Sequence, residues 1–283
     1  MRICPACSAA VAGPDWACPA CGHRPATTAG LLLLAPELAR SDASFPSADF
    51  DRLAELEDGN YWFRSRNKLI VWALRKLFPG FGSFLEVGCG TGCVLAAIER
   101  AFPGVACSGS ELHVAGLAHA AKRLRRSNLL QMDATRIPFR AEFDVIGSFD
   151  VLEHIEGDRE VLAQCFLALR SGGGLILTVP QHRFLWSARD EYARHVRRYA
   201  RSELVEKLRA AGFRPVLITS FVSLLFPLLV LARASAFDPQ AELNVGRLAN
   251  LVLEGVLSLE RWLIAAGVRF PFGGSLLVVA EKP

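Results

Sequence analysis

The feature that most constrains the fold is a glycine-rich segment between a short apolar run and a helical pattern. Phe84 to Val87 has the apolar character of a buried strand, and Val94 to Arg100 has the spacing of a helix. Between them stand Gly88, Gly90 and Gly92. Glycines at alternate positions let the backbone turn tightly and approach a ligand, while the start of the following helix offers free N–H groups. The segment therefore predicts a strand–loop–helix unit that binds a ligand.

Strands and helices alternate along most of the remaining chain. The pattern predicts helices within 51–77 and over 94–100, 114–126, 158–170 and 201–211, and strands over 84–87, 105–108, 129–132, 143–148, 175–179, 216–219 and 275–280. Alternation of this kind is typical of right-handed βαβ units and a parallel sheet. We therefore expect an α/β fold, with the main domain over 51–283 and its N-terminal helices over 51–78.

Two acidic residues follow the next two predicted strands after the glycine segment. Glu111 comes after the second strand, where a carboxylate can accept hydrogen bonds from both hydroxyls of a ribose. Asp133 comes after the third strand, where it can accept from an adenine amino group. The glycine spacing is G-x-G-x-G, with Cys93 where the dinucleotide fingerprint has its third glycine, which disfavours a nicotinamide cofactor.

With these residues in place, the chain resembles the class I S-adenosylmethionine-dependent methyltransferases of the small-molecule type, which include the ubiquinone-biosynthesis methyltransferases. The resemblance covers about residues 60–215. It rests on Glu86 to Gly92, Glu111, Asp133-Ala134, Ile137-Pro138-Phe139, Asp150 to Ile155 and Leu169 to Gly174. It implies a Rossmann-like, seven-stranded sheet flanked by helices, whose last strand is antiparallel.

The resemblance also implies S-adenosylmethionine as the cofactor and a position for each site residue. Glu86, Gly88, Cys89, Gly90 and Gly92 would face its methionyl end, Arg66 its carboxylate, Glu111 and Leu112 its ribose, Asp133 and Ala134 its adenine, and Phe149 and Asp150 its methyl group. The implied activity is transfer of a methyl group to a small acceptor.

Two histidines are candidates for removing a proton from an acceptor hydroxyl, since histidine has a suitable pKa for that task. His154 lies in the segment after the fourth strand, and His195 follows the strand that ends at Pro180. The alternative for each is a structural role at a helix end. Some ubiquinone-type relatives share the Glu153-His154 pair and use a metal there, and one pair alone does not establish a metal site.

Cysteines at the start of the chain indicate a metal site. Cys4 and Cys7 form one CxxC pair, and Cys18 and Cys21 form a second. Four thiolates at this spacing can surround one zinc ion tetrahedrally and leave no open position, so the site would be structural. We expect a zinc ribbon over 1–25 and a linker or docked strap over 26–50. The chain starts without an apolar signal segment, so we expect a cytoplasmic protein with its other four cysteines reduced.

Hydrophobic residues make up 52% of the chain, and its mean hydropathy is +0.28. These values exclude a disordered protein, and the hydrophobic fraction is higher than that of a typical soluble protein. Much of the excess falls after Arg214, where no charge occurs between Pro215 and Ala232. We expect a strand and then a helix over 221–236, paired with a second helix over 241–266. This insertion, 221–267, would cover the acceptor pocket. Its apolar surface would be core, a dimer face or a shallow contact with a membrane.

The sequence predicts a methyltransferase that acts on a small, apolar or lipid-linked acceptor, most readily at oxygen. An RNA methyltransferase with a zinc-ribbon RNA-binding module is the first alternative, but the net charge of +4 is modest and an Asn/Asp-Pro-Pro-aromatic motif is absent. A non-catalytic zinc-ribbon adaptor is the second. Six arginines between Arg183 and Arg201 would bind an anionic group or form a solvated face.

Overall fold

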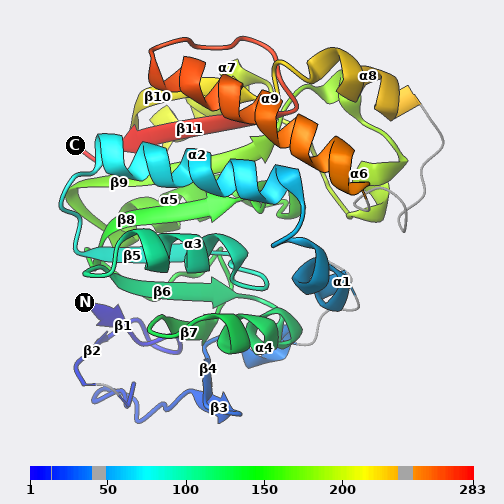
Figure 1. Ribbon diagram of the computed structural model, residues 1–283. Helices are drawn as coiled ribbons and strands as arrows, with labels where there is room; N and C mark the ends of the chain where they lie inside the picture. Colours follow the sequence, from blue (N-terminus) through cyan, green and yellow to red (C-terminus); the bar gives the residue numbers. More distant parts are fainter. Residues whose placement is uncertain (14, 40–48, 235–244) are drawn as a thin grey trace.

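A mostly parallel sheet forms the centre of the computed structural model, which describes residues 1–13, 15–39, 49–234 and 245–283 (Figure 1). Its strands lie in the order β10-β11-β9-β8-β5-β6-β7-β4-β3. The seven strands expected for the family are β5 Ser83–Val87, β6 Ala106–Glu111, β7 Asn128–Gln131, β8 Phe143–Phe149, β9 Leu169–Pro180, β10 Arg214–Phe221 and β11 Ser275–Glu281. Strand β11 is antiparallel to both of its neighbours. The predicted Rossmann-like fold with an antiparallel last strand is therefore confirmed.

Two further strands lie where the composition predicts a linker or docked strap. They are β3, Ala26–Thr28, and β4, Leu31–Leu33, and they form a hairpin whose second strand pairs in parallel with β7. The Gln131 side chain fixes this arrangement, because its amide donates to the carbonyl of Ala35 at 2.8 Å and accepts from the Ala35 N–H at 3.0 Å. The short leucine run thus covers the edge of β7, which would otherwise expose unpaired backbone groups.

Helices cover both faces of the sheet (Figure 1). One core joins the sheet to α2 (Tyr61–Leu77), α3 (Cys93–Ala101), α4 (Val114–Arg123) and α9 (Arg247–Ala265), and a second core joins it to α5 (Asp158–Ala168) and α7 (Arg201–Ala210). The helical pattern predicted over 51–77 is two helices, because α1 (Asp49–Leu56) ends before Gly59. Asn60 then caps α2 by accepting from the N–H of Trp62 at 2.9 Å.

The N-terminal module, with β1 (Arg2–Ile3) and β2 (Ala10–Val11), docks on the segment that follows β7. The N–H of Ile3 donates to the carbonyl of Pro138 at 2.9 Å, and the ring of Trp16 lies edge-on to that of Phe139, with centroids 5.5 Å apart. Trp16 is buried in the same core as α5 and α7. The module is thus anchored a few residues after the expected adenine-side Asp133.

The insertion between β10 and β11 contains α8 (Phe226–Ala234) and α9. We predicted that the two helices pair with each other, but α9 packs chiefly along α2 (Figure 1). The Glu254 carboxylate on α9 explains part of this placement, since it pairs with Arg64 and Lys68 of α2. Glu260 accepts from the backbone N–H groups of Ser223 and Leu224 and so caps the turn before α8. Residues 241–244, where we expected the second helix to begin, lie outside the described residues. None of the described helices has the length and apolarity needed to cross a membrane.

Candidate active site

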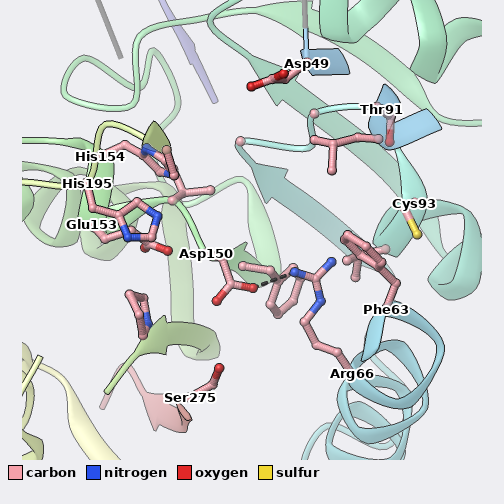
Figure 2. Close-up of a pocket in the computed structure, with 18 of the residues that line it drawn as sticks. Asp49, Phe63, Arg66, Thr91, Cys93, Asp150, Glu153, His154, His195 and Ser275 are labelled. Carbon is pink, nitrogen blue, oxygen red and sulfur yellow. Dashed lines mark hydrogen bonds and ion pairs between the residues drawn. The ribbon is translucent and has the colours of Figure 1, made fainter. Parts of the chain in front are cut away.

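A cavity of about 740 Å³ opens at the carboxyl ends of the central parallel strands, between the sheet and the helices α1 and α2. This edge is where open α/β sheets bind ligands. Nearly every residue predicted for the site lines the cavity, and Figure 2 shows several of them facing it. These are Arg66, Glu86, Gly88, Cys89, Gly90, Glu111, Leu112, Asp133, Ala134, Phe149, Asp150, His154 and His195.

The glycine loop forms one wall of the cavity. Gly88 has a φ of +76°, and a Cβ atom there would lie 2.4 Å from a methyl group of Val151, so no other residue fits without displacement. Gly90 lines the cavity, and its N–H donates to Glu111 at 3.0 Å. Gly92 differs from the prediction, because it is the N-cap of α3 and packs against Ala120 and Leu124 away from the cavity lining.

The acidic residues after β6 and β7 organise their own turns. One carboxylate oxygen of Glu111 accepts from the N–H groups of Leu112 and His113 at 2.7 and 3.1 Å. Asp133 accepts from the N–H and the hydroxyl of Thr135, both at 2.8 Å. These contacts fix the direction of each carboxylate at the cavity wall, as recognition of a nucleoside requires.

Glu86 at the end of β5 is a buried carboxylate whose second oxygen, Oε2, has no hydrogen-bond partner. Burial raises its pKa well above the ordinary value, although Arg66 opposes the shift. An unpartnered buried oxygen is costly unless a ligand completes it. The position therefore fits a cationic or hydrogen-bond-donating ligand group such as an ammonium.

Arg66 and Asp150 form an ion pair across the floor of the cavity (Figure 2). Nη1 of Arg66 lies 2.5 Å from Oδ2 of Asp150, and the guanidinium stacks over the ring of Trp62 at 4.5 Å. Asp150 has a φ of +58°, a strained conformation for a residue with a side chain. Strain that is retained at the end of β8, in the cavity wall, is typical of a functional position.

The two predicted histidines come together on one side of the cavity. Their rings are 4.7 Å apart, and Figure 2 shows them beside Glu153. Nδ1 of His195 lies 2.9 Å from Oδ1 of Asp190, a residue that the sequence did not single out. Asp190 also accepts from Nε of Arg198 at 2.7 Å. Burial opposes its ionisation, but the contacts with His195 and Arg198 outweigh burial and lower the pKa of Asp190 to about 2.

Glu153 makes the same cluster a candidate metal site. One ligand atom each from Glu153, His154 and His195 lies within 4.8 Å of the others. Oε2 of Glu153 is buried and has no hydrogen-bond partner, and burial raises the pKa of this carboxyl well above its usual range. The donor set, one carboxylate and two imidazoles, is one that divalent cations accept.

The arginines between Arg183 and Arg201 are largely engaged within the protein. Arg183 pairs with Glu203, Arg197 with Glu156 and Asp158, and Arg198 with Asp190, while Arg201 donates to the carbonyl of Phe270. These contacts favour the structural interpretation of the cluster over a dedicated anion site. Arg189 also lines the cavity.

The four N-terminal cysteines converge as predicted. Their sulfur atoms lie within 4.8 Å of one another, with 3.7 Å between the Sγ atoms of Cys4 and Cys21 and 3.5 Å between those of Cys7 and Cys18. A tetrahedron with Zn–S bonds of about 2.3 Å has S–S edges of about 3.8 Å. The cluster is therefore compatible with one zinc ion.

Comparison with known proteins places these features in a family. The methyltransferase domain family matches residues 50–218. A Mycolicibacterium smegmatis protein named "Probable S-adenosylmethionine-dependent methyltransferase" is 30% identical over 164 residues, which cover 56% of this chain and 61% of that protein. The ubiquinone biosynthesis O-methyltransferase of Psychrobacter arcticus is 28% identical over 102 residues, which cover 33% of this chain and 39% of that protein. The chain thus spans less than two thirds of the length of these relatives.

The fold is shared with solved methyltransferase structures. Phosphoethanolamine N-methyltransferase 2 of Haemonchus contortus, in complex with phosphomonomethylethanolamine and S-adenosylhomocysteine, superposes with a TM-score of 0.57 at 19% identity. The match covers 84% of this chain and 57% of that one.

Proposed function

The chain belongs to the S-adenosylmethionine-dependent methyltransferases, and on that premise we propose that it methylates a small, apolar acceptor at oxygen. The observation that carries this proposal is the Asp190–His195 pair at the cavity. It supplies an imidazole held by a buried carboxylate in the same cavity that the glycine loop lines. Such a pair is suited to taking a proton from a hydroxyl group.

The residues around the glycine loop suit S-adenosylmethionine, which supplies an electrophilic methyl group when bound. Glu86 would receive the ammonium of its methionyl part, because that cation completes the unpartnered Oε2. Glu111 would hold the ribose and Asp133 the adenine, since both carboxylates already face the cavity from rigid turns. Arg66 would attract the carboxylate of the cofactor while remaining paired with Asp150.

His195 would act as the general base, and Asp190 as the residue that positions it. The contact between Asp190 and Nδ1 directs the other ring nitrogen, Nε2, away from Asp190 and leaves it for an acceptor hydroxyl. Because Asp190 stays ionised over the whole working range of pH, it also stabilises the imidazolium that forms when His195 takes the proton. His154 would complete the wall of this part of the cavity.

A divalent cation on Glu153, His154 and His195 is the competing mechanism at the same place. It would lower the pKa of a bound acceptor hydroxyl instead of taking the proton. The two mechanisms differ in one measurable respect, which is the activity of protein that retains the N-terminal zinc but has no metal ion at the Glu153–His154–His195 cluster. The base mechanism predicts full activity after chelation, whereas loss that is restored by added Mg²⁺ or Mn²⁺ would support the cation.

The apolar nature of the acceptor is supported by the far wall of the cavity. Pro180, Val222 and Leu229 line it at the base of the insertion. A hydrocarbon part of the acceptor would be buried against these side chains, which favours binding by roughly 25 cal/mol per Å² of apolar surface removed from water. A lipid-linked acceptor with a hydroxyl near its headgroup would place its hydrocarbon part against this wall and its hydroxyl next to His195.

The N-terminal ribbon would hold a structural zinc ion on Cys4, Cys7, Cys18 and Cys21. A module this small has no sufficient core of its own, so metal binding would supply much of its folding free energy. Metal analysis of the purified protein should find one zinc per chain, and the C18S variant should lose it. Absence of zinc in the unchanged protein would contradict this part of the proposal.

The acceptor proposal is tested with S-adenosylmethionine whose methyl group carries an isotopic label. The protein is incubated with the lipid fraction and, separately, with the aqueous fraction of a cell extract, and the labelled product is analysed by mass spectrometry and NMR. We expect label in the lipid fraction, with the methyl chemical shift of an O-methyl group. Label only in RNA, or on nitrogen or carbon, would overturn the proposed acceptor while leaving the methyltransferase family unaffected.

A further inference from the structure

Helix α9 turns its polar side chains toward the protein. Asn250 accepts from the N–H of Tyr61 at 2.7 Å, at the start of α2. Glu254 binds Nζ of Lys68 at 2.7 Å and Nε of Arg64 at 3.1 Å. Glu260 is fully buried and caps the turn before α8. Leu257 and Ile264 are buried on this same side, so the side of α9 that faces the protein combines core leucine and isoleucine with paired polar groups.

The opposite side of α9 is apolar and exposed. Leu248 is 77% exposed near the start of the helix and Trp262 is 69% exposed near its end. Further exposed apolar residues lie between them at helical spacing, namely Leu251, Val252 and Leu259. Residues three, four, seven and eleven apart share one side of a helix, so these residues form one stripe about 20 Å long. We call these five residues the α9 stripe.

Helix α8 adds apolar surface to the same insertion. Leu231 is 70% exposed, and Leu228 is exposed as well. The adjacent Leu229 instead lines the cavity, together with Val222. Helix α8 therefore exposes some apolar side chains to solvent and places another in the wall of the expected acceptor side of the cavity.

Among the described residues of the insertion, the outward-facing charges are arginines. In the described residues of 221–274 the acids are Glu254 and Glu260, and both face the protein. Arg247 and Arg269 are exposed at the two ends of α9, and Arg261 is partly exposed next to Trp262. An apolar stripe with tryptophan at one end and arginines, and with no outward acid in the part of the insertion that the structure describes, suits an interface that is apolar and negatively charged.

We propose that the α9 stripe binds the surface of a bilayer that contains anionic lipid, with the helix axis in the plane of the membrane. A second copy of the chain fits less well, because symmetric pairing through α9 would bring arginines together with no facing carboxylate among the described residues of the insertion. Binding through the stripe requires no helix that spans the bilayer. It needs only that the apolar side chains enter the boundary between headgroups and acyl chains.

The docking surface also bears on the acceptor, and only this consequence rests on the proposed function. Since α8 borders the cavity through Leu229, a bilayer held against the insertion would lie close to the acceptor side of the site. A lipid-linked acceptor would then reach His195 without leaving the membrane completely. Vesicle binding can be measured without any acceptor, so failure of the docking surface and failure of the proposed chemistry are distinguishable.

The test uses the full chain and vesicles of phosphatidylcholine with or without phosphatidylglycerol, separated from free protein by sedimentation. We expect binding to the anionic vesicles that decreases as salt is added. The variant L248Q/L259Q/W262Q should bind them at least a hundredfold more weakly, since three large apolar groups no longer enter the interface. The matched control is L167Q, which replaces an exposed leucine on α5 outside the insertion and should bind like the unchanged protein.

Three further measurements separate a loss of vesicle binding from a loss of structure and show the effect of charge. Thermal unfolding and S-adenosylmethionine binding should be unchanged in the triple variant, because its three side chains are exposed. The variant R247Q/R261Q should lose roughly tenfold or more in affinity for the anionic vesicles and little for neutral ones. Equal binding by the triple variant and the unchanged protein, or a stable dimer of the unchanged protein that the triple variant dissociates, would overturn the proposal.

Discussion

The two halves of the active-site cavity are built in different ways. In the cofactor half, each carboxylate stands within one turn of its own strand end, and backbone N–H groups fix Glu111. In the proposed acceptor half, His154, Asp190 and Leu229 come from three separate segments, and ion pairs and side-chain contacts hold this part of the cavity together. The proposed cofactor site is therefore set up by the local sequence, whereas the proposed acceptor site depends on tertiary structure.

The largest expected effect comes from a substitution that disrupts only the cofactor half of the cavity. In G88V the new side chain would overlap Val151 and force a β-branched residue to a positive φ, so we expect no detectable binding of S-adenosylmethionine by calorimetry. G104A is the matched control, because a Cβ there meets no atom within 4 Å. Retained affinity in a folded G88V protein would show that the loop does not contact the cofactor.

The next largest effect comes from a substitution that disrupts only the acceptor half of the cavity. Replacing His195 by alanine should lower kcat about a thousandfold, within the usual range for loss of a general base. The affinity for S-adenosylmethionine should not change, because the cofactor half does not depend on this residue. D190N should lower kcat less and alter its pH profile, since Asp190 orients the base and stabilises its charged form but does not itself take the proton. A kcat in H195A equal to that of the unchanged enzyme would exclude both histidine mechanisms.

The third prediction concerns the buried ion pairs that hold the acceptor half of the cavity together. Asp158 accepts from Tyr199 at 2.7 Å and pairs with Arg197 at 2.8 Å, and so ties the segment after β9 to α5. Burial alone would raise the pKa of Asp158, but Lys207, Tyr199 and Arg197 lower it. A carboxyl with a lowered folded pKa contributes stability above its unfolded pKa, about 3.9, and that contribution is lost as pH falls through the folded value.

D158N should accordingly lower the free energy of unfolding by about 3 kcal/mol at neutral pH, the size typical of a broken buried ion pair. The difference between the variant and the unchanged protein should shrink as the pH is lowered below about 4. Urea unfolding at the two pH values measures it. A difference that does not depend on pH would mean that the charge of Asp158 contributes nothing.

The smallest effect concerns Glu86. E86Q should weaken binding of S-adenosylmethionine about tenfold, because a charge-assisted contact with its ammonium becomes a neutral one. Burial raises the pKa of Glu86 in the folded protein, so the ionised group costs stability at pH values above its unfolded pKa. The ligand-free E86Q protein should therefore melt at the same or a higher temperature. Tighter binding of the cofactor by E86Q would contradict the assigned role.

The difference between the halves also explains what the sequence could predict. The succession of strands and helices along the chain from Ser83 to Glu281 follows from hydrophobic patterns and turn residues, whereas the antiparallel last strand is implied by the family resemblance. The glycine loop and Glu111 follow from spacing. Asp190 could not be found in this way, because its importance comes from contacts with His195 and Arg198 in a folded turn. A capping box with Ser187 is the single local signal at that position.

Two segments at the edges of the fold also have structures that the sequence alone could not predict. The leucine run at 31–33 becomes a strand because β7 offers an unpaired edge, a partner about a hundred residues away. Helix α9 has an apolar side that the sequence shows clearly, but apolar periodicity predicts a buried side. In the structure, Asn250, Glu254, Leu257 and Ile264 lie on the opposite side, against the protein, so the apolar side faces outward.

The most direct test of the central claim is a calorimetric titration of the unchanged protein with S-adenosylmethionine and with its demethylated product. The account predicts saturable binding of one molecule per chain for both compounds, with H195A binding them as tightly as the unchanged protein. Failure of the folded, unchanged protein to bind either compound would contradict the claim that this cavity is the active site of a methyltransferase.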